Sequence, residues 1–154
     1  MKTTIAAIST PPGNSGIGII RVSGPEVPKL IKKLFKKPLN PREATLRKLH
    51  DLDGNIIDNA IAIYFQQPKS YTGEDMLEIH THGNPIILET ILNNITRNNI
   101  RHAKPGEFTE KAFLNDKIDL TQAEAVSDLI TSRSLSAVKG AYNSLRGRFS
   151  DKIL

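Results

Sequence analysis

The chain has 154 residues, enough for one domain of ordinary size with a real core, and its 38% hydrophobic and 24% charged content is typical of a globular protein. It has no cysteine, which excludes disulfides, thiolate metal sites and thiol nucleophiles. No apolar run is long enough to span a membrane, so we expect a cytoplasmic protein without membrane association. The formal net charge of +5 allows contact with nucleic-acid phosphates.

Apolar periodicity and turn residues predict the elements of the first two thirds of the chain. Two prolines and two glycines exclude a regular element at residues 9–16, and Asp53-Gly54 between two apolar runs predicts a hairpin. Pro85 suits the first turn of a helix. The expected strands are 3–9, 17–23, 46–52, 56–65 and 76–81, and the expected helices are 25–35 and 85–98.

The last third is predicted to be mainly helical. A loop at 101–107 precedes a short helix at 108–114, and Thr121 with Glu124 fits a capping box that begins a helical stretch, interrupted around 131–134. An apolar stripe at steps of three and four then includes Leu135, Val138, Tyr142, Leu145, Phe149 and Ile153. This stripe either packs back on the sheet or begins a helical domain, and we favour the second interpretation.

Strands and helices are mixed without regular alternation. This order predicts an α/β (α+β) fold with a mixed, largely antiparallel sheet and flanking helices.

The glycine-rich loop at 13–18 is not a typical phosphate loop, because such a loop opens a helix and this one precedes strand-like residues. The sequence contains no G-x-x-x-x-G-K-[ST] motif, so no nucleoside triphosphate site is recognisable. The loop is either a place where a ligand comes close to the backbone or a plain tight connection.

Arg21 and Glu78 are charged residues within predicted strands. Arg21 needs an anionic partner among its apolar neighbours, either an internal carboxylate or a ligand. Glu78, His80 and His82 share one face, but positions two apart on a strand are about 7 Å apart, which disfavours a common metal ion. The Glu78 carboxylate suits two adjacent N–H donors, such as those of a pterin ring. A salt bridge between Glu78 and Arg21 is the equally simple alternative.

Two further groups of cations have open roles. Lys117, in the polar elbow after the short helix, either covers an anionic ligand or points to water. The early lysine cluster is either a solvated helix face or an RNA-binding surface, and it lacks the interleaved aromatic residues that stack on bases. The cluster consists of Lys29, Lys32, Lys33, Lys36 and Lys37.

Several long blocks together resemble the N-terminal region of the MnmE (TrmE) tRNA modification GTPases. They follow in the same order and cover nearly the whole chain. The blocks are residues 10–13 with 16–24, 70–78, 82–83, and 105–120 running on into 122–125. The sequence departs from the family at Asn84, where a glycine is frequent, and at Lys111, where arginine is usual.

The resemblance implies a fold like the folate-binding domain of aminomethyltransferases. Residues 1–118 would form a tetrahydrofolate-binding and homodimerisation domain, and 119–154 the first helices of a truncated helical domain. The implied ligand is a 5-formyl- or 5,10-methylene-tetrahydrofolate, and the folate contacts of the family fall on Arg21, Glu78 and Lys117. No catalytic residue and no metal ligand is carried over.

For the whole protein the resemblance implies a reaction with a flavin-containing MnmG partner. The product is a (carboxymethyl)aminomethyl group on carbon 5 of the wobble uridine of tRNA, with folate as the one-carbon source. GTP, Mg and K would belong to a GTPase domain that this chain lacks, so we expect no GTP hydrolysis by the chain alone. The alternatives are a basic tRNA-binding module and a purely structural homodimerisation module.

Overall fold

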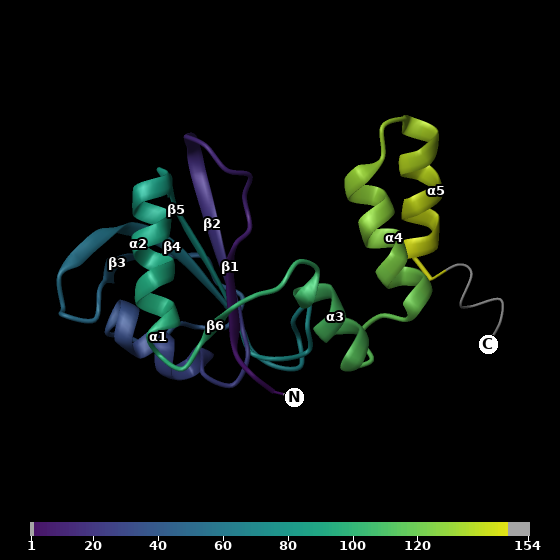
Figure 1. Ribbon diagram of the computed structural model, residues 1–154. Coiled ribbons are helices and arrows are strands. Elements are labelled where there is room, and N and C mark those ends of the chain that lie inside the picture. Colours follow the sequence, from purple (N-terminus) through teal and green to yellow (C-terminus); the bar gives the residue numbers. More distant parts are fainter. Residues whose placement is uncertain (1, 148–154) are drawn as a thin grey trace. The chain divides into compact units, whose positions relative to one another are not determined.

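The computed structural model describes residues 2–147, so Phe149 and Ile153 of the expected apolar stripe lie outside the described part (Figure 1). The chain forms two compact units. The sheet unit contains residues 1–70 and 74–105, and the helical unit contains residues 71–73 and 106–154.

A six-stranded sheet forms the centre of the sheet unit. Its strands lie in the order β3-β4-β5-β2-β1-β6, and every neighbouring pair is antiparallel except β1 with β6. The predicted mixed, largely antiparallel sheet is therefore confirmed. The strands are β1 (Ile5–Ile8), β2 (Ser15–Ser23), β3 (Thr45–His50), β4 (Ile56–Phe65), β5 (Met76–Gly83) and β6 (Arg101–His102).

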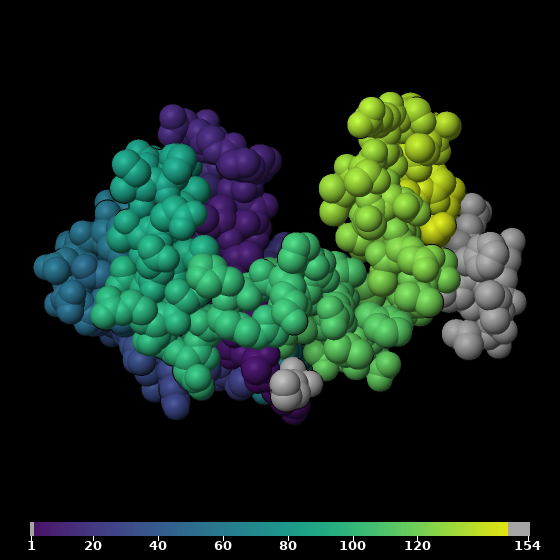
Figure 2. Space-filling model, viewed as in Figure 1, coloured from purple at the N-terminus to yellow at the C-terminus, as the bar shows by residue number. Residues whose placement is uncertain are grey.

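Two helices, α1 (Val27–Phe35) and α2 (Pro85–Thr96), share one hydrophobic core with one face of the sheet. Pro28 is in the first turn of α1, the place where a helix tolerates proline. Asn84 caps α2, since its Oδ1 accepts a hydrogen bond from the Ile86 N–H at 2.8 Å. In the space-filling view α2 forms an outer surface of this unit (Figure 2). The core residues between the sheet and the two helices include Ile20, Val22, Leu77, Ile79, Leu30, Leu34, Leu88 and Ile91.

The helical unit contains α3 (Glu107–Leu114), α4 (Leu120–Thr131) and α5 (Leu135–Leu145). The predicted interruption between α4 and α5 is confirmed at residues 132–134. The predicted capping box was wrong, however, because the residue before α4 is Asp119, whose Oδ1 accepts from the Gln122 N–H at 2.8 Å. The Gln122 side chain in turn accepts from the Asp119 N–H at 3.0 Å. An aspartate three residues before a glutamine satisfies the same amides as threonine with glutamate.

One strand was missed. Residues 101–102, predicted as loop, form β6, a two-residue strand parallel to β1. Its pairing is with residues almost a hundred positions earlier, as in the hydrogen bond from Arg101 N–H to the Thr4 carbonyl at 3.1 Å. A partner so distant in sequence leaves no local pattern.

The connection from β4 to β5 is fixed to the sheet unit around Asp75. Its Oδ1 accepts from the Tyr64 hydroxyl at 3.0 Å and from the Gln67 N–H at 2.9 Å. The neighbouring Glu74 accepts from the Ser23 hydroxyl at 2.9 Å. Partial burial and the adjacent Asp75 carboxylate raise the pKa of Tyr64 to about 12, because both disfavour the phenolate.

Gly24 is expected to tolerate no side chain. Its φ is +141°, and a Cβ there would lie 2.5 Å from the Thr4 Cα, a backbone atom that cannot move aside. We expect Gly24→Ala to lower the free energy of unfolding by about 3 kcal/mol or more in a urea titration. Gly54→Ala is the matched control, since its φ is +88° and nothing lies within 4 Å of the added Cβ. The control should lose only about 1 kcal/mol, and equal losses would contradict the collision.

Tyr64 should make stability sensitive to alkaline pH. Because its folded pKa of about 12 lies above the ordinary value of 10.0, this contribution is complete below pH 10 and is lost as the pH rises toward 12. Tyr64→Phe should cost roughly 1.5–3 kcal/mol at pH 8, the range for a hydrogen bond to a charged group. In urea titrations, the free energy of unfolding of the variant should also fall less between pH 10 and pH 12 than that of wild type. Tyr142→Phe, at an exposed tyrosine, is the control, and identical pH profiles for wild type and Tyr64→Phe would refute the assignment.

Candidate functional site

Arg21 and Glu78 meet on the face of the sheet opposite α1 and α2. They are direct partners in the antiparallel register of β2 and β5, and their neighbours Ile20, Val22 and Leu77 point into the core. The Arg21 Nη2 lies 3.8 Å from the Glu78 Oε2, close enough for attraction but too long for a hydrogen bond. The ion pair considered as the structural alternative is therefore present.

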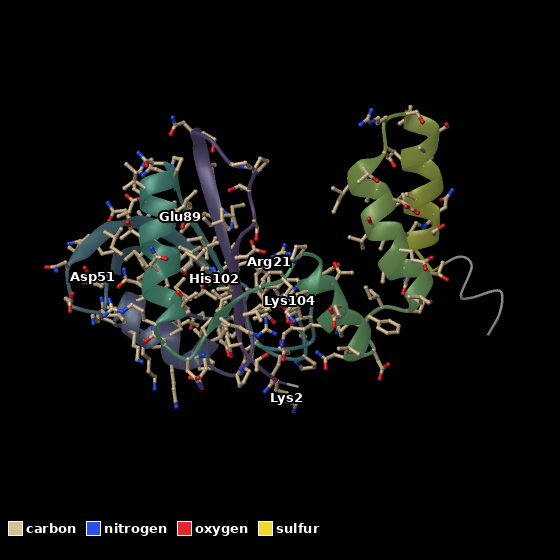
Figure 3. The ribbon with its side chains drawn as sticks, in the orientation of Figure 1. Lys2, Arg21, Asp51, Glu89, His102 and Lys104 are labelled. Carbon is tan, nitrogen blue, oxygen red and sulfur yellow. The ribbon has the colours of Figure 1, made fainter. Side chains whose placement is uncertain are left out.

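Both charged side chains remain within reach of solvent. The side chain of Arg21 is 32% exposed and that of Glu78 is 21% exposed. Arg21 extends from β2 within the sheet unit (Figure 3). A partly desolvated carboxylate forms stronger hydrogen bonds than one in bulk water, so the pair offers both charge signs to a ligand.

His80 is a partner of Glu78 that the sequence reasoning missed. Its Nε2 lies 3.1 Å from the Glu78 Oε1, on the same face two residues along β5. The contact orients the carboxylate between an imidazole and a guanidinium. The signal for it was present, because residues two apart on a strand share a face, but we considered His80 only as a metal ligand.

The metal alternative for this strand finds no support in the described part of the chain, where no three His, Asp or Glu side chains converge. His82 instead pairs with Asp58, whose Oδ2 lies 3.0 Å from the His82 Nδ1. Partial burial works to raise the pKa of Asp58. Hydrogen bonds from His82 and from the Asn59 N–H outweigh that effect, so the pKa lies below its ordinary value.

An apolar row lies beside the charged pair on the same face of the sheet. The register places Ile19 opposite His80, His80 opposite Ile61, and Ile61 opposite Leu46. Ile61 is 43% exposed and Leu46 is 69% exposed. Within residues 2–70 and 74–105, no helix covers this face, so the row is available to a ligand or a second protein surface.

Lys117 belongs to the helical unit, in the turn after α3. Its side chain passes close to Gly73, where an added Cβ would lie 3.2 Å from the Lys117 Cγ. The same turn is fixed by the Asn115 side chain, whose Nδ2 donates to the Thr72 carbonyl at 2.8 Å. The 70–78 and 105–120 blocks of the sequence therefore meet within this unit, and the stem of Lys117 is held by that contact while its side chain remains exposed.

The glycine-rich loop has structural reasons for two of its glycines. A Cβ at Gly18 would lie 2.6 Å from the Leu88 Cδ1, so this glycine lets α2 approach β2. Gly13, with a φ of +106°, needs the freedom of glycine for its backbone. The loop and the start of α2 border a cavity of about 270 Å³ lined by Ile8, Thr10, Pro11, Pro12, Gly13, Pro85, Leu88 and Glu89.

No helix among residues 2–147 is both long and apolar enough to cross a lipid bilayer.

Comparisons with known proteins give one consistent family. The family model described as "GTP-binding protein TrmE N-terminus" matches residues 4–117. Proteins named tRNA modification GTPase MnmE are 55% identical in Blochmanniella pennsylvanica and 54% identical in Francisella tularensis subsp. novicida, over 97% and 99% of this chain. The corresponding protein of Buchnera aphidicola subsp. Cinara cedri is 52% identical over 97% of the chain.

The chain spans about a third of the length of these relatives, 32% to 34% of each. The family model covers most of the described residues, including both β2 and β5 and the turn that carries Lys117. The chain therefore belongs to the MnmE (TrmE) family of tRNA modification GTPases, of which it matches the N-terminal region.

Proposed function

We propose that the chain binds a tetrahydrofolate derivative, such as 5-formyl- or 5,10-methylene-tetrahydrofolate, through Arg21, Glu78 and Lys117. The observation that supports this proposal is the Arg21–Glu78 pair on an accessible face of the sheet, separated by 3.8 Å. A pair made only for stability gains most from direct hydrogen bonds, whereas this one is too long for them.

Glu78 has the capacity to accept from the pterin edge. A carboxylate offers about four lone-pair sites, and the contact with His80 takes up one of them on Oε1, whereas Arg21 lies 3.8 Å from Oε2. Two adjacent N–H donors of a pterin ring match the remaining acceptor geometry. Such charge-assisted, bidentate bonds supply both affinity and orientation.

Arg21 and Lys117 would supply positive charge to the polar groups or the glutamate tail of the ligand. Arg21 is held beside Glu78 on β2. Lys117 enters the proposal from the family resemblance, and its contact with Gly73 and the Asn115–Thr72 bond restrict the turn from which it extends.

We propose that the sheet face beside the pair also forms a homodimer contact. The row of Ile61 and Leu46 is apolar and exposed, and monomeric proteins rarely leave contiguous apolar surface uncovered. A two-fold contact on this face would bring two folate sites close to the interface.

The proposal for the whole protein follows the names of the relatives for tRNA modification and GTPase activity, and the family resemblance for the rest. It would be a cytoplasmic tRNA modification GTPase that acts with an MnmG-type flavoprotein on carbon 5 of the wobble uridine of tRNA, with the folate bound here as the one-carbon source. GTP, Mg²⁺ and K⁺ would bind a GTPase domain outside this chain, whose sequence contains no phosphate-loop motif.

Glu78→Ala is expected to weaken the binding of 5-formyltetrahydrofolate by ten- to a hundredfold in isothermal titration calorimetry. This corresponds to roughly 1.5–3 kcal/mol, the range for hydrogen bonds to a charged group. Lys117→Ala, titrated in parallel, should also weaken binding.

Glu89→Ala is the matched control for this titration, because it removes an exposed carboxylate from α2 on the helix-covered side of the sheet. Thermal unfolding of each variant separates binding from folding. A Glu78→Ala protein that loses stability but binds folate with wild-type affinity would leave the pair as a purely structural ion pair. A wild-type dimer without any folate heat would favour the homodimerisation module.

Ile61→Glu is expected to convert the dimer to a monomer of 17.0 kDa in size-exclusion chromatography with light scattering. A charge buried without a partner costs several kcal/mol, so the dimer dissociation constant should rise about a hundredfold or more. Ile86→Glu is the control, since Ile86 is 76% exposed on α2. A monomeric wild type, or an Ile61→Glu protein that stays dimeric, would exclude this face as the interface.

A further inference from the structure

One face of α1 carries three lysines and a fourth is its C-cap residue, so that four lysines at positions i, i+3, i+4 and i+7 form a stripe along the helix. The lysine stripe consists of Lys29, Lys32, Lys33 and Lys36, all exposed. We propose that this stripe is a docking surface for the phosphate backbone of a base-paired RNA stem. Taking that RNA to be tRNA rests on the proposed function, whereas the surface itself is argued from its own residues.

The stripe lies on the side of α1 opposite to the core. At 100° per residue, the buried residues and the lysines centre on directions about 180° apart. The four lysines span about 10 Å of helix axis, and Lys37 follows directly. In the figures α1 lies at the lower edge of the sheet unit, and nitrogen-tipped side chains extend outward around it (Figure 3). The buried residues are Val27, Leu30, Ile31, Leu34 and Phe35.

Helix stability accounts for only part of this arrangement, because Lys32 and Lys33 lie in the last turn, where the helix dipole favours cations. Lys29 lies in the first turn, where the helix dipole disfavours a cation, and that turn holds no acidic residue. Lysines three and four apart repel one another. Among residues 2–147, none of the ion pairs involves a lysine of the stripe. Lys29 and the close spacing of the four lysines therefore place more positive charge on α1 than its own stability favours, as expected of a surface that meets an anion.

The C-terminal end of α2 extends the basic surface. The Lys33 Nζ donates to the Asn98 side chain at 2.9 Å, which places the residues after α2 beside the stripe. Arg97, the residue next to Asn98, is exposed at the end of α2. This hydrogen bond brings the end of α2, with its exposed Arg97, close to the stripe and adds a further cation to the region.

The chemistry of the surface favours an RNA backbone over a membrane. A helix that binds lipid inserts its apolar face, but the apolar residues of α1 are all committed to the core. The absence of aromatic residues from the stripe also argues against stacking on unpaired bases. Lysines without stacking partners recognise phosphates independently of sequence, which fits a base-paired stem.

The stripe and the Arg21–Glu78 pair lie on different faces of the same sheet. The stripe belongs to the helix-covered face, and the pair lies on the face without helices of that unit. A stem bound by α1 would therefore be anchored away from the pair, and its role would be to hold the RNA, not to take part in chemistry.

The test compares two variants of the full chain that lose the same charge. The stripe variant carries K29Q, K32Q, K33Q and K36Q, and the control carries K48Q, K69Q, K104Q and K139Q at exposed lysines elsewhere. Each lowers the formal net charge from +5 to +1. The probe is a fluorescein-labelled RNA duplex of about 20 base pairs, and its anisotropy is measured at about 50 and 200 mM KCl, with unlabelled tRNA as competitor.

Wild type and control should bind the duplex with a steep salt dependence, and tRNA should displace it. The stripe variant loses four phosphate contacts, so its affinity should fall relative to wild type. This loss of affinity should be about a hundredfold larger at 50 mM than at 200 mM KCl. Thermal unfolding should show the stripe variant about as stable as wild type, because the repulsion removed within α1 offsets the lost attraction of Lys32 and Lys33 to the helix C-terminus. Its affinity for 5-formyltetrahydrofolate should equal that of wild type, which separates this proposal from the folate site.

Three outcomes would overturn the docking surface. Equal losses of RNA binding in the two variants would show that only net charge matters. Displacement of the probe by a single-stranded oligonucleotide at lower concentrations than by an unlabelled duplex would exclude preferential recognition of a stem. Binding of phosphatidylserine vesicles that the stripe variant loses, with unchanged RNA binding, would assign the lysines to a membrane.

Discussion

The antiparallel register between β2 and β5 is the constraint on which the rest of the sheet unit depends. It places Arg21 opposite Glu78 and, because side chains alternate, commits Val22 to the core. A slip of one residue would exchange the two faces, burying a guanidinium and exposing the core. The two strands also pack closely where they end, since a Cβ on Gly83 would lie 2.5 Å from the Ser15 carbonyl oxygen, but the register shifts between Ser15 and Gly18.

The sequence predicted those parts of the fold that depend on local signals. The strands around Asp53-Gly54, the two helices of the sheet unit and the break between α4 and α5 all follow from periodicity, turn residues or proline placement, and the structure confirms them. The strand β6 was not predictable, because its pairing with β1 joins residues far apart in the chain. The cap of α4 was placed two residues late, since Asp119-x-x-Gln122 and Thr121-x-x-Glu124 both satisfy the pattern and only geometry chooses between them.

The candidate site shows the same division between local and distant information. The alternation of side chains along a strand predicted that Glu78 and His80 share one face. The Arg21–Glu78 salt bridge was considered as an alternative, but the pairing of β2 with β5 that brings the two residues together cannot be predicted from local sequence. The third residue, Lys117, has a restricted stem because a turn and a distant glycine, Gly73, pack against each other. No periodic pattern marks such a contact. The prediction that Lys117 belongs to the site came from the family resemblance and not from the spacing of residues.

The two faces of the sheet would allow the two proposed kinds of binding to be altered independently. The lysine stripe would act through charges that face away from the core, and the Arg21–Glu78 pair through directed contacts on the other side of the strands. Between them lies a closely packed hydrophobic core that includes Val22, Leu77 and Leu34. Residues that share no partner contribute additively, so changes on the stripe and changes at the pair should combine without coupling. The same separation would let a domain of this size hold a vitamin and an RNA stem at once, because neither ligand displaces the other.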